Sequence, residues 1–355
     1  MSTHTIGTVL VTGGAGFIGC ALSHELAGSV DRWVVLDSLH PQVHATGERP
    51  ADLHADAELV IGDVTDAAAW DAVLATVRPD VVIHLAAETG TAQSLHEASR
   101  HSLVNVVGTT EMLDAFGRAG IVPGLVVLSS SRAVYGEGQW RNAAGELYVP
   151  GQRSHGQLEQ AEWDFSESVP APSSVERTWP TPTSVYGATK LAQEHILSAW
   201  VEAHDSALGI LRLQNVYGPG QSLINSYTGI VSLFSQLAAA GSSIPVYEDG
   251  KITRDFVYIA DVAAAFAALL RNPPTSGLVR YDVGSGVGTT ISDLAGHIAD
   301  YHAAPAPHVT GAYRDGDVRF ASCDIQPTIE KLDWRPEWSV ERGVGALQNW
   351  IAAQA

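Results

Sequence analysis

The sequence has few cysteines, few cations and no long hydrophobic run. Its two cysteines, Cys20 and Cys323, are far apart and neither belongs to a CxxC motif, so we expect neither a disulfide framework nor a metal site. Lys and Arg number 20 against 39 Asp and Glu, and the net charge of -19 disfavours nucleic acid as a partner because it repels polyphosphate. No apolar stretch reaches the roughly eighteen residues of a membrane span, and the start lacks a basic signal-peptide region, which predicts a cytoplasmic protein without membrane contact.

What the sequence does have is 45% apolar residues in a chain of 355, enough for a large core. Short β-branched runs alternate with alanine- and leucine-rich stretches that are typical of helices. The runs are residues 8–11, 33–36, 59–61, 81–85, 125–128 and 208–213. This alternation predicts an α/β fold with a doubly wound parallel sheet that is covered by helices on both faces.

A glycine-rich turn follows the first of these runs. Gly13, Gly16 and Gly19 allow a tight turn, close approach to a pyrophosphate and close packing of the next helix. The second run ends at Asp37, which can accept hydrogen bonds from both hydroxyls of an adenosine ribose and repels a 2′-phosphate. Asp63, after the third run, can accept from the adenine amino group. The pattern predicts a Rossmann-type site for NAD rather than NADP.

The chain divides into two expected domains on the same grounds. We assign residues 1–216, together with 255–275, to an NAD-binding Rossmann domain, since the strand-helix alternation is strict there. Within it, residues 139–182 are rich in Gly, Pro, Ser, Gln and Glu, which predicts a long irregular insertion. Residues 217–254 and 276–355 are assigned mainly to a smaller C-terminal substrate-binding domain.

Three polar residues form a candidate catalytic group. Tyr186 and Lys190 lie one turn apart on the same face of a predicted helix, and a nearby ammonium favours the phenolate form of a tyrosine. Ser131 follows the run 125–128 at the carboxyl end of the sheet, where ligands of such sheets bind. Its hydroxyl can orient a reacting hydroxyl between phenolate and nicotinamide. We therefore predict Ser131, Tyr186 and Lys190 as catalytic residues.

Two arginines stand out in a chain that has few cations. Arg254 and Arg314 suit phosphate binding because a guanidinium donates two parallel hydrogen bonds. The alternative is a structural ion pair of each arginine with its neighbour, Asp255 or Asp315.

Seven motifs together resemble those of the extended short-chain dehydrogenase/reductase superfamily, in its NAD-dependent sugar-nucleotide epimerase/dehydratase branch: TGGAGFIG, HLAA, SSSRAVYG, YGATK, LRLQNVYGPG, RDFVYIADV and YRDGDVR. The resemblance covers nearly the whole chain and implies a homodimer. It implies NAD contacts at Gly13, Gly16, Phe17, Ile18, Gly19, Asp37, Asp63, Val64, Leu85, Ala86, Tyr186 and Lys190. It also implies that Asn215 and Arg254 hold a substrate diphosphate and that Arg314 and Asp317 lie at the nucleotide.

The resemblance further indicates which reaction to expect. Dehydratases of the family resemble one another in an acidic residue just after the catalytic Ser or Thr, whereas Arg132 and Ala133 follow Ser131 here. Epimerisation remains, in which Tyr186 takes the proton of a sugar hydroxyl and the transient ketone is reduced on its other face. NAD is restored in each cycle.

Within the branch, residues 36–44, 226–229 and 247–250 most resemble nucleotide-sugar epimerases of the dTDP-L-rhamnose 4-epimerase type, acting on dTDP- or UDP-sugars. That group leads us to expect paired cysteines before Tyr186, and this chain has none there. A UDP-hexose 4-epimerase is an alternative within enzymology. A non-catalytic NAD-binding sensor or scaffold is an alternative of another class.

Overall fold

The computed structural model describes residues 5–222 and 229–354, so part of the 226–229 stretch lies outside the described residues. Its largest element is a seven-stranded parallel sheet of order β13-β9-β5-β4-β1-β2-β3. The strands are β1 (Ile6–Thr12), β2 (Val30–Asp37), β3 (Glu58–Ile61), β4 (Val81–His84), β5 (Leu125–Ser131), β9 (Ala207–Leu213) and β13 (Gly277–Val283). All six predicted strands are present, which confirms the doubly wound α/β fold.

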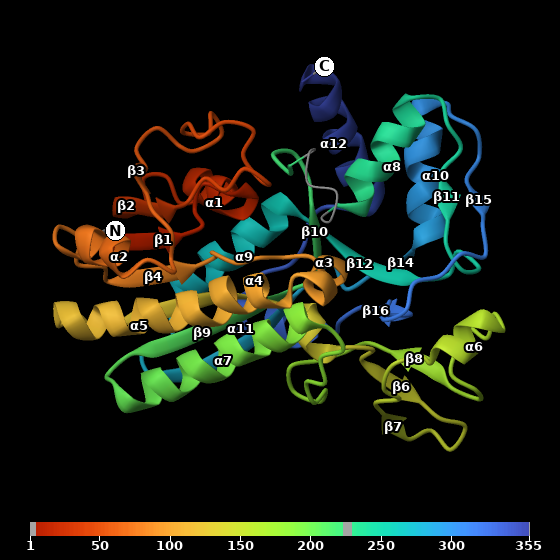
Figure 1. Ribbon diagram of the computed structural model, residues 1–355, viewed down its shortest axis with the longest axis horizontal. Coiled ribbons are helices and arrows are strands. Elements are labelled where there is room, and N and C mark those ends of the chain that lie inside the picture. The colour runs from red at the N-terminus through yellow and green to blue at the C-terminus, as the bar shows by residue number, and fades with distance from the viewer. Residues whose placement is uncertain (1–4, 223–228, 355) are drawn as a thin grey trace.

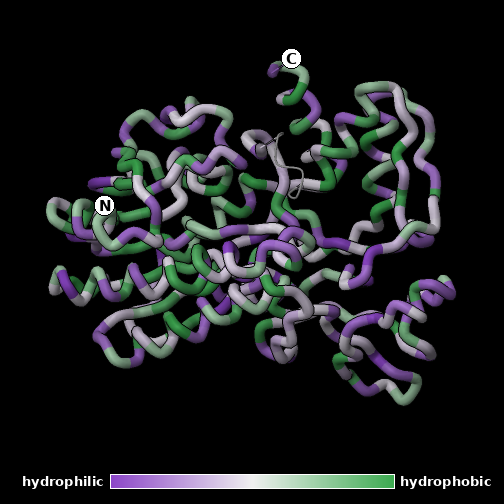
Figure 2. The backbone as a smooth tube through the Cα atoms, in the orientation of Figure 1, coloured by the Kyte–Doolittle hydropathy of each residue, from purple (hydrophilic) through white to green (hydrophobic). Residues whose placement is uncertain are grey.

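Helices cover both faces of this sheet (Figure 1). One face carries α1 (Phe17–Glu25) and α9 (Ile259–Arg271), and the other carries α2 (Ala67–Leu74), α5 (Gly108–Ala119) and α7 (Val185–Ala203). Val9 and Val11 point into the first layer and Leu10 into the second, because side chains alternate along a strand. In Figure 2 the hydrophobic colour is accordingly concentrated in the interior.

A segment with short helices follows β4. It comprises α3 (Thr91–His96), α4 (Ala98–Ser102) and the π-helical η1 (Leu103–Val107), which runs on into α5. This segment packs against α7. It therefore brings residues after β4 close to the helix that carries the YxxxK pair.

The C-terminal part has its own hydrophobic core. Its elements are α8 (Ile230–Ala239), α10 (Ile291–His302), α12 (Val340–Gln354), the four-stranded sheet of β10 (Asn215–Tyr217), β12 (Thr253–Tyr258), β14 (Gly288–Thr290) and β16 (Phe320–Ala321), and the pair β11 (Pro245–Val246) with β15 (His308–Val309). Phe17 and Ile18 also pack on this core, so the glycine turn lies between the two parts. β13 completes the large sheet and α11 (Gln326–Leu332) packs on it, although both follow residue 276. The remaining division into domains stays a prediction.

The insertion, residues 139–182, contains more regular structure than the sequence indicates. It holds a three-stranded sheet of order β7-β6-β8, made of β6 (Gln139–Arg141), β7 (Leu147–Tyr148) and β8 (Val169–Ala171), and the short helix α6 (His155–Glu159). Trp140 is fully buried there and meets Phe165 edge to face at 4.9 Å between ring centroids. Strands of two or three residues are too short to give a hydrophobic alternation in the sequence.

Within the described residues, no helix is both long and apolar enough to cross a membrane. The same part of the chain holds no group of three or more His, Cys, Asp or Glu side chains arranged for a metal ion. Cys20 and Cys323 are both buried and unpaired with each other.

Candidate active site

The turn between β1 and α1 requires glycine at two positions. Gly13 has a φ of +66°, and a Cβ there would lie 2.7 Å from the backbone nitrogen of Ala86. A Cβ on Gly19 would lie 2.3 Å from the carbonyl oxygen of Gly14. Gly16 precedes α1 without a side-chain cap and lines a cavity, and such a helix N-terminus attracts phosphate. The turn therefore has the shape of a diphosphate cradle.

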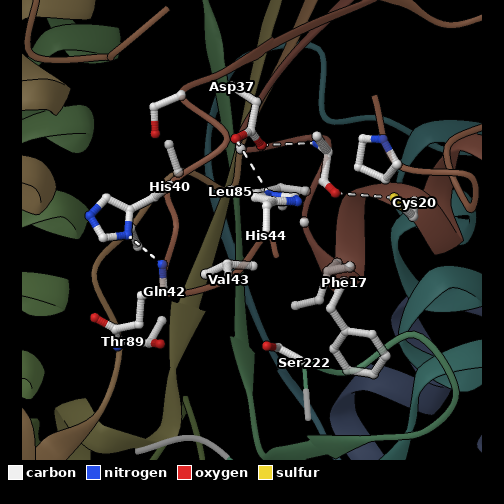
Figure 3. A pocket seen from close by; sticks show the side chains of 18 of the residues that line it. Phe17, Cys20, Asp37, His40, Gln42, Val43, His44, Leu85, Thr89 and Ser222 are labelled. Carbon is white, nitrogen blue, oxygen red and sulfur yellow. Dashed lines mark hydrogen bonds and ion pairs between the residues drawn. The ribbon is translucent and has the colours of Figure 1, made fainter. Parts of the chain in front are cut away.

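A cavity of about 640 Å³ opens beside this turn (Figure 3). The carboxylate of Asp37 forms part of its wall and accepts hydrogen bonds from the backbone nitrogens of Ala15 at 3.0 Å and Leu39 at 2.9 Å. Nε2 of His44 lies 3.8 Å from Oδ1 of Asp37. The cavity lining includes Gly13, Gly16, Phe17, Ile18, Asp37, Asp63, Val64, Leu85 and Ala86, all of which the sequence assigns to the cofactor. Gly19 instead packs behind the turn.

The loop of residues 38–50 adds cavity residues that sequence reasoning missed. Gln42 in this loop donates to Oε1 of Gln93 in α3 at 3.0 Å and accepts from NH2 of Arg100 in α4 at 2.8 Å. Arg100 also donates to Glu88 at 2.8 Å. These bonds tie the loop to helices α3 and α4. The two sides are far apart in the chain, and no sequence spacing connects them.

A second cavity, of about 430 Å³, contains the predicted catalytic group. Ser131, Tyr186 and Lys190 all line it. Ile18 and Leu85 line both this cavity and the one beside the glycine turn, so the two cavities adjoin. The structure thus brings the three side chains together next to the candidate cofactor site.

Helix α7 begins at this cavity because of a cap and a close backbone approach. Oγ of Ser184 accepts a hydrogen bond from the backbone nitrogen of Gly187 at 3.0 Å, as an N-cap does. A Cβ on Gly187 would lie 2.4 Å from the carbonyl oxygen of Ala133 in the 3₁₀ turn η2 (Arg132–Tyr135), which follows β5. The start of α7, with Tyr186, is therefore held directly against the end of β5.

The charge beside the phenol differs from the one the sequence suggests. Burial raises the pKa of Tyr186, while a hydrogen bond from Ser131 and the positive charge of Arg132 lower it. Sequence reasoning assigned the lowering to Lys190. Arg132 lines the same cavity and is brought to Tyr186 by the packing of η2 on α7. The positive charge of Arg132 thus acts on the candidate base, while its NH2 donates to the carbonyl oxygen of Gly136 at 2.6 Å.

Lys190 sits in a buried polar network. Its side chain is 2% exposed, and Nζ donates to Oε1 of Gln193 at 2.7 Å. Burial lowers the pKa of Lys190 to about 7, and the nearby charge of Glu194 acts in the opposite direction. At neutral pH Lys190 is therefore protonated to a smaller extent than an exposed lysine.

Arg254 and Asp317 form one unit on the other side of the cavity. NH2 of Arg254 donates to Oδ1 of Asp317 at 2.6 Å, and NH1 donates to the carbonyl oxygen of Val318 at 2.7 Å. Asp255 instead accepts from the backbone nitrogen of Ser285 at 2.7 Å. The alternative in which Arg254 pairs with Asp255 is therefore wrong.

Arg314 also does not pair with the aspartate next to it in the sequence, Asp315. It packs over an aromatic ring instead. Its guanidinium carbon lies 5.0 Å from the ring centroid of Tyr247. Asp315 is 3.0 Å from Nδ1 of His155 in the insertion. Asn215, Arg254, Arg314 and Asp317 all line the cavity that holds the catalytic group. The four predicted substrate residues thus share one cavity with Tyr186.

Comparison with known proteins gives a consistent result. The family model described as NAD dependent epimerase/dehydratase family matches residues 9–284. A protein of Burkholderia thailandensis described as dTDP-L-rhamnose 4-epimerase is 60% identical over 98% of this chain and 95% of its own length. The crystal structure of UDP-glucose 4-epimerase from Thermotoga maritima with UDP-glucose has a TM-score of 0.79, is 27% identical and covers 98% of this chain and 99% of its own. That of UDP-glucose 4-epimerase from Thermus thermophilus with NAD has a TM-score of 0.76, is 28% identical and covers 98% of this chain and 100% of its own.

The first cavity fits the cofactor that the family name implies. Its glycine turn leaves room for a diphosphate at the start of α1, and the oriented carboxylate of Asp37 suits a ribose without a 2′-phosphate. The chain is an enzyme that uses NAD and belongs to the NAD-dependent epimerase/dehydratase family.

Proposed function

We propose that the protein is a nucleotide-sugar 4-epimerase of the dTDP-L-rhamnose 4-epimerase type. The observation that carries this is the 60% identity, over 98% of the chain, to a protein described by that name. The joint cavity of Ser131, Tyr186 and Lys190 beside the cofactor site supports a redox reaction at a sugar hydroxyl. The proposed substrate is a nucleoside-diphosphate 6-deoxyhexose, with dTDP as the favoured nucleotide.

Each of the polar residues that line the cavity has a separate role in such a reaction. The glycine turn and Asp37 would hold NAD, which would take up the hydride from carbon 4 and return it. Tyr186 accepts the proton of the sugar hydroxyl and later returns it, while Ser131 orients that hydroxyl by hydrogen bonding. Arg254, oriented by Asp317, holds the diphosphate. The sugar ring can then turn over while the nucleotide stays in place.

The function is tested by supplying the purified protein with dTDP-L-rhamnose and following the sugar resonances by NMR. We expect the signal of the C4 epimer to grow to an equilibrium mixture without added reductant. UDP-glucose and UDP-galactose serve as the comparison, because the Thermotoga structure has UDP-glucose bound. Faster turnover of the UDP-hexoses would replace the proposed substrate with the UDP-hexose alternative.

Replacing Arg132 by glutamine is expected to move the acidic limb of the kcat–pH profile to higher pH. The base Tyr186 must be deprotonated, and the charge of Arg132 lowers the pKa of Tyr186. Without that charge the pKa rises, so activity is lost at a higher pH as the solution is acidified and is recovered by raising the pH. The measurement is the initial rate at saturating substrate across pH.

Arg132→Lys is the matched control, because it keeps the charge beside Tyr186 and should leave the limb near that of the wild type. An unmoved limb in Arg132→Gln, with a change in KM alone, would show that Arg132 contacts substrate rather than acting on the base.

We further propose that the protein is a homodimer and works in the cytoplasm, where its cofactor and nucleotide sugars are supplied. Leu95 in α3 and Leu103 and Val107 in η1 are exposed by 52%, 50% and 43%, and this segment packs beside α7. A second copy would cover these apolar side chains. Native mass spectrometry is expected to give twice the chain mass, and Leu103→Glu with Val107→Glu is expected to give the monomer. A dimer that persists in this variant would place the interface elsewhere.

A further inference from the structure

A buried arginine of the insertion joins it to two distant parts of the chain. The side chain of Arg153 is 1% exposed, and its NH1 and NH2 donate to the carboxylate of Glu248 at 2.9 and 2.8 Å. NH2 also donates to the main-chain carbonyl oxygen of Asp317 at 2.9 Å, and NH1 to that of Trp163 at 3.0 Å. One guanidinium therefore fixes the insertion, the turn after β11 and the loop before β16 in a single arrangement.

Arg319 completes this network from the opposite side. Its NH1 donates to Glu248 at 3.0 Å and to Asp249 at 2.7 Å, and its Nε donates to Asp164 of the insertion at 2.7 Å. The carboxylate of Glu248 is 0% exposed and lies between two arginines. The insertion has no cysteine. The ion pairs of Arg153 with Glu248 and of Asp164 with Arg319 join it to the rest of the protein.

The loop of residues 313–318 contacts both the insertion and the substrate cavity. On the cavity side, Arg314 and Asp317 belong to the lining. Asp315 also lines the cavity, and its carboxylate lies 3.0 Å from Nδ1 of His155 in the insertion. The loop thus rests on the insertion while it presents two predicted substrate residues to the cavity.

Asp317 links Arg153 of the insertion to Arg254, the predicted diphosphate-binding residue. Its carbonyl oxygen accepts from Arg153, and its Oδ1 accepts from NH2 of Arg254 at 2.6 Å. NH1 of Arg254 donates to the carbonyl oxygen of the next residue, Val318, at 2.7 Å. The guanidinium of Arg254 is therefore oriented by a stretch of backbone that Arg153 holds in place.

We propose that the insertion braces the diphosphate site and that Arg153 is the positioning residue through which it does so. Among the described residues that line the substrate cavity, Arg153 does not occur. It therefore acts on the site indirectly, through its hydrogen bond to Asp317, which in turn binds Arg254. A guanidinium can bind a carboxylate and a carbonyl oxygen at fixed angles, which an ammonium cannot. The inference rests on the proposed function, because the ligand is the nucleoside diphosphate part of that substrate.

The experiment measures dTDP binding to the NAD-loaded protein by calorimetry, together with kcat and KM for the nucleotide sugar. Arg153→Lys keeps the buried charge but loses the fork that reaches both Glu248 and Asp317. We expect the Kd for dTDP and the KM to rise by about tenfold or more, because a misplaced binding group loses most of its effect. The kcat and the amount of bound NAD should stay close to those of the wild type.

A second variant separates positioning from stability. Arg153→Met combined with Glu248→Met replaces both charges with apolar side chains of similar size, which is often neutral or stabilising, and Arg319 keeps Asp164 and Asp249 as partners. The bond to the Asp317 carbonyl is still absent, so the Kd for dTDP should stay raised at wild-type thermal stability. Arg141→Met is the control, since Arg141 is an exposed arginine of the insertion that donates to Gly145 in its own hairpin. It should bind dTDP as the wild type does.

Two outcomes overturn the brace while the proposed function stands. One is a folded Met/Met variant that binds dTDP as tightly as the wild type does. The other is an Arg153→Lys variant with lowered kcat and unchanged Kd. A wild-type protein that binds neither dTDP nor UDP overturns the proposed function itself, and the brace with it.

Discussion

Tyr186→Phe is expected to lower kcat for 4-epimerisation by about 10²–10⁴-fold, the usual contribution of a general acid–base group. The substitution removes the hydroxyl that exchanges a proton with the sugar but keeps the ring that fills the cavity. NAD should remain bound, because the glycine turn and Asp37 are untouched. Turnover is measured by NMR and the bound cofactor by mass spectrometry of the native protein.

Tyr301→Phe is the matched control, because Tyr301 is 46% exposed on α10, donates to Asn349 and lines neither cavity. It should keep wild-type activity. Wild-type activity in Tyr186→Phe would remove this phenol from the mechanism. An NAD-bound wild-type protein that is as inactive as the variant on every nucleotide sugar would favour the sensor or scaffold alternative.

The large sheet could be predicted because most of its strands are continuous apolar runs buried on both faces. β13 lacks such a run, because its sequence GLVRYDV places Arg280 and Asp282 inside the strand. Asp282 is fully buried and accepts from the hydroxyl of Tyr135 at 2.9 Å and from the backbone nitrogen of Val175 at 2.8 Å. These partners lie more than a hundred positions away in the chain, so the sequence gives no sign that Asp282 can be buried. A charged residue without a visible partner is expected at the surface, and the sequence therefore does not predict β13.

The site shows the same contrast between local and distant information. The glycine turn, Asp37 and the Tyr186–Lys190 pair are each encoded by a short stretch, and the structure places them in two adjoining cavities. The Gln42–Arg100 hydrogen bond and the influence of the Arg132 charge on the phenol arise only when separate segments meet. Spacing along the chain carries no trace of such pairs, which is why the charge beside Tyr186 was assigned to Lys190.

Glu194→Ala is expected to lower the free energy of unfolding by about 3–5 kcal/mol, the usual cost of breaking a buried ion pair. Glu194 is 1% exposed and accepts from Oγ of Ser130 at 2.6 Å and from Nε and NH2 of Arg212 at 2.9 and 2.7 Å. Without it the guanidinium of Arg212, itself 3% exposed, loses the carboxylate that binds it at two points. Denaturant unfolding of the holoenzyme measures the change. Glu202→Ala, exposed on the same helix, should stay within about 0.5 kcal/mol of the wild type.

The carboxylate of Glu194 also raises the pKa of Lys190, which gives Glu194 a second measurable role. Burial lowers the pKa of Lys190 to about 7 and Glu194 raises it, so Glu194→Gln should lower that pKa further. The ammonium of Lys190, which the sequence predicts to be catalytic, is then lost at a lower pH, so the fall of kcat on the alkaline side should move toward acid. A Glu194→Gln protein that is destabilised but keeps its alkaline limb would show that Glu194 supports the fold without tuning Lys190.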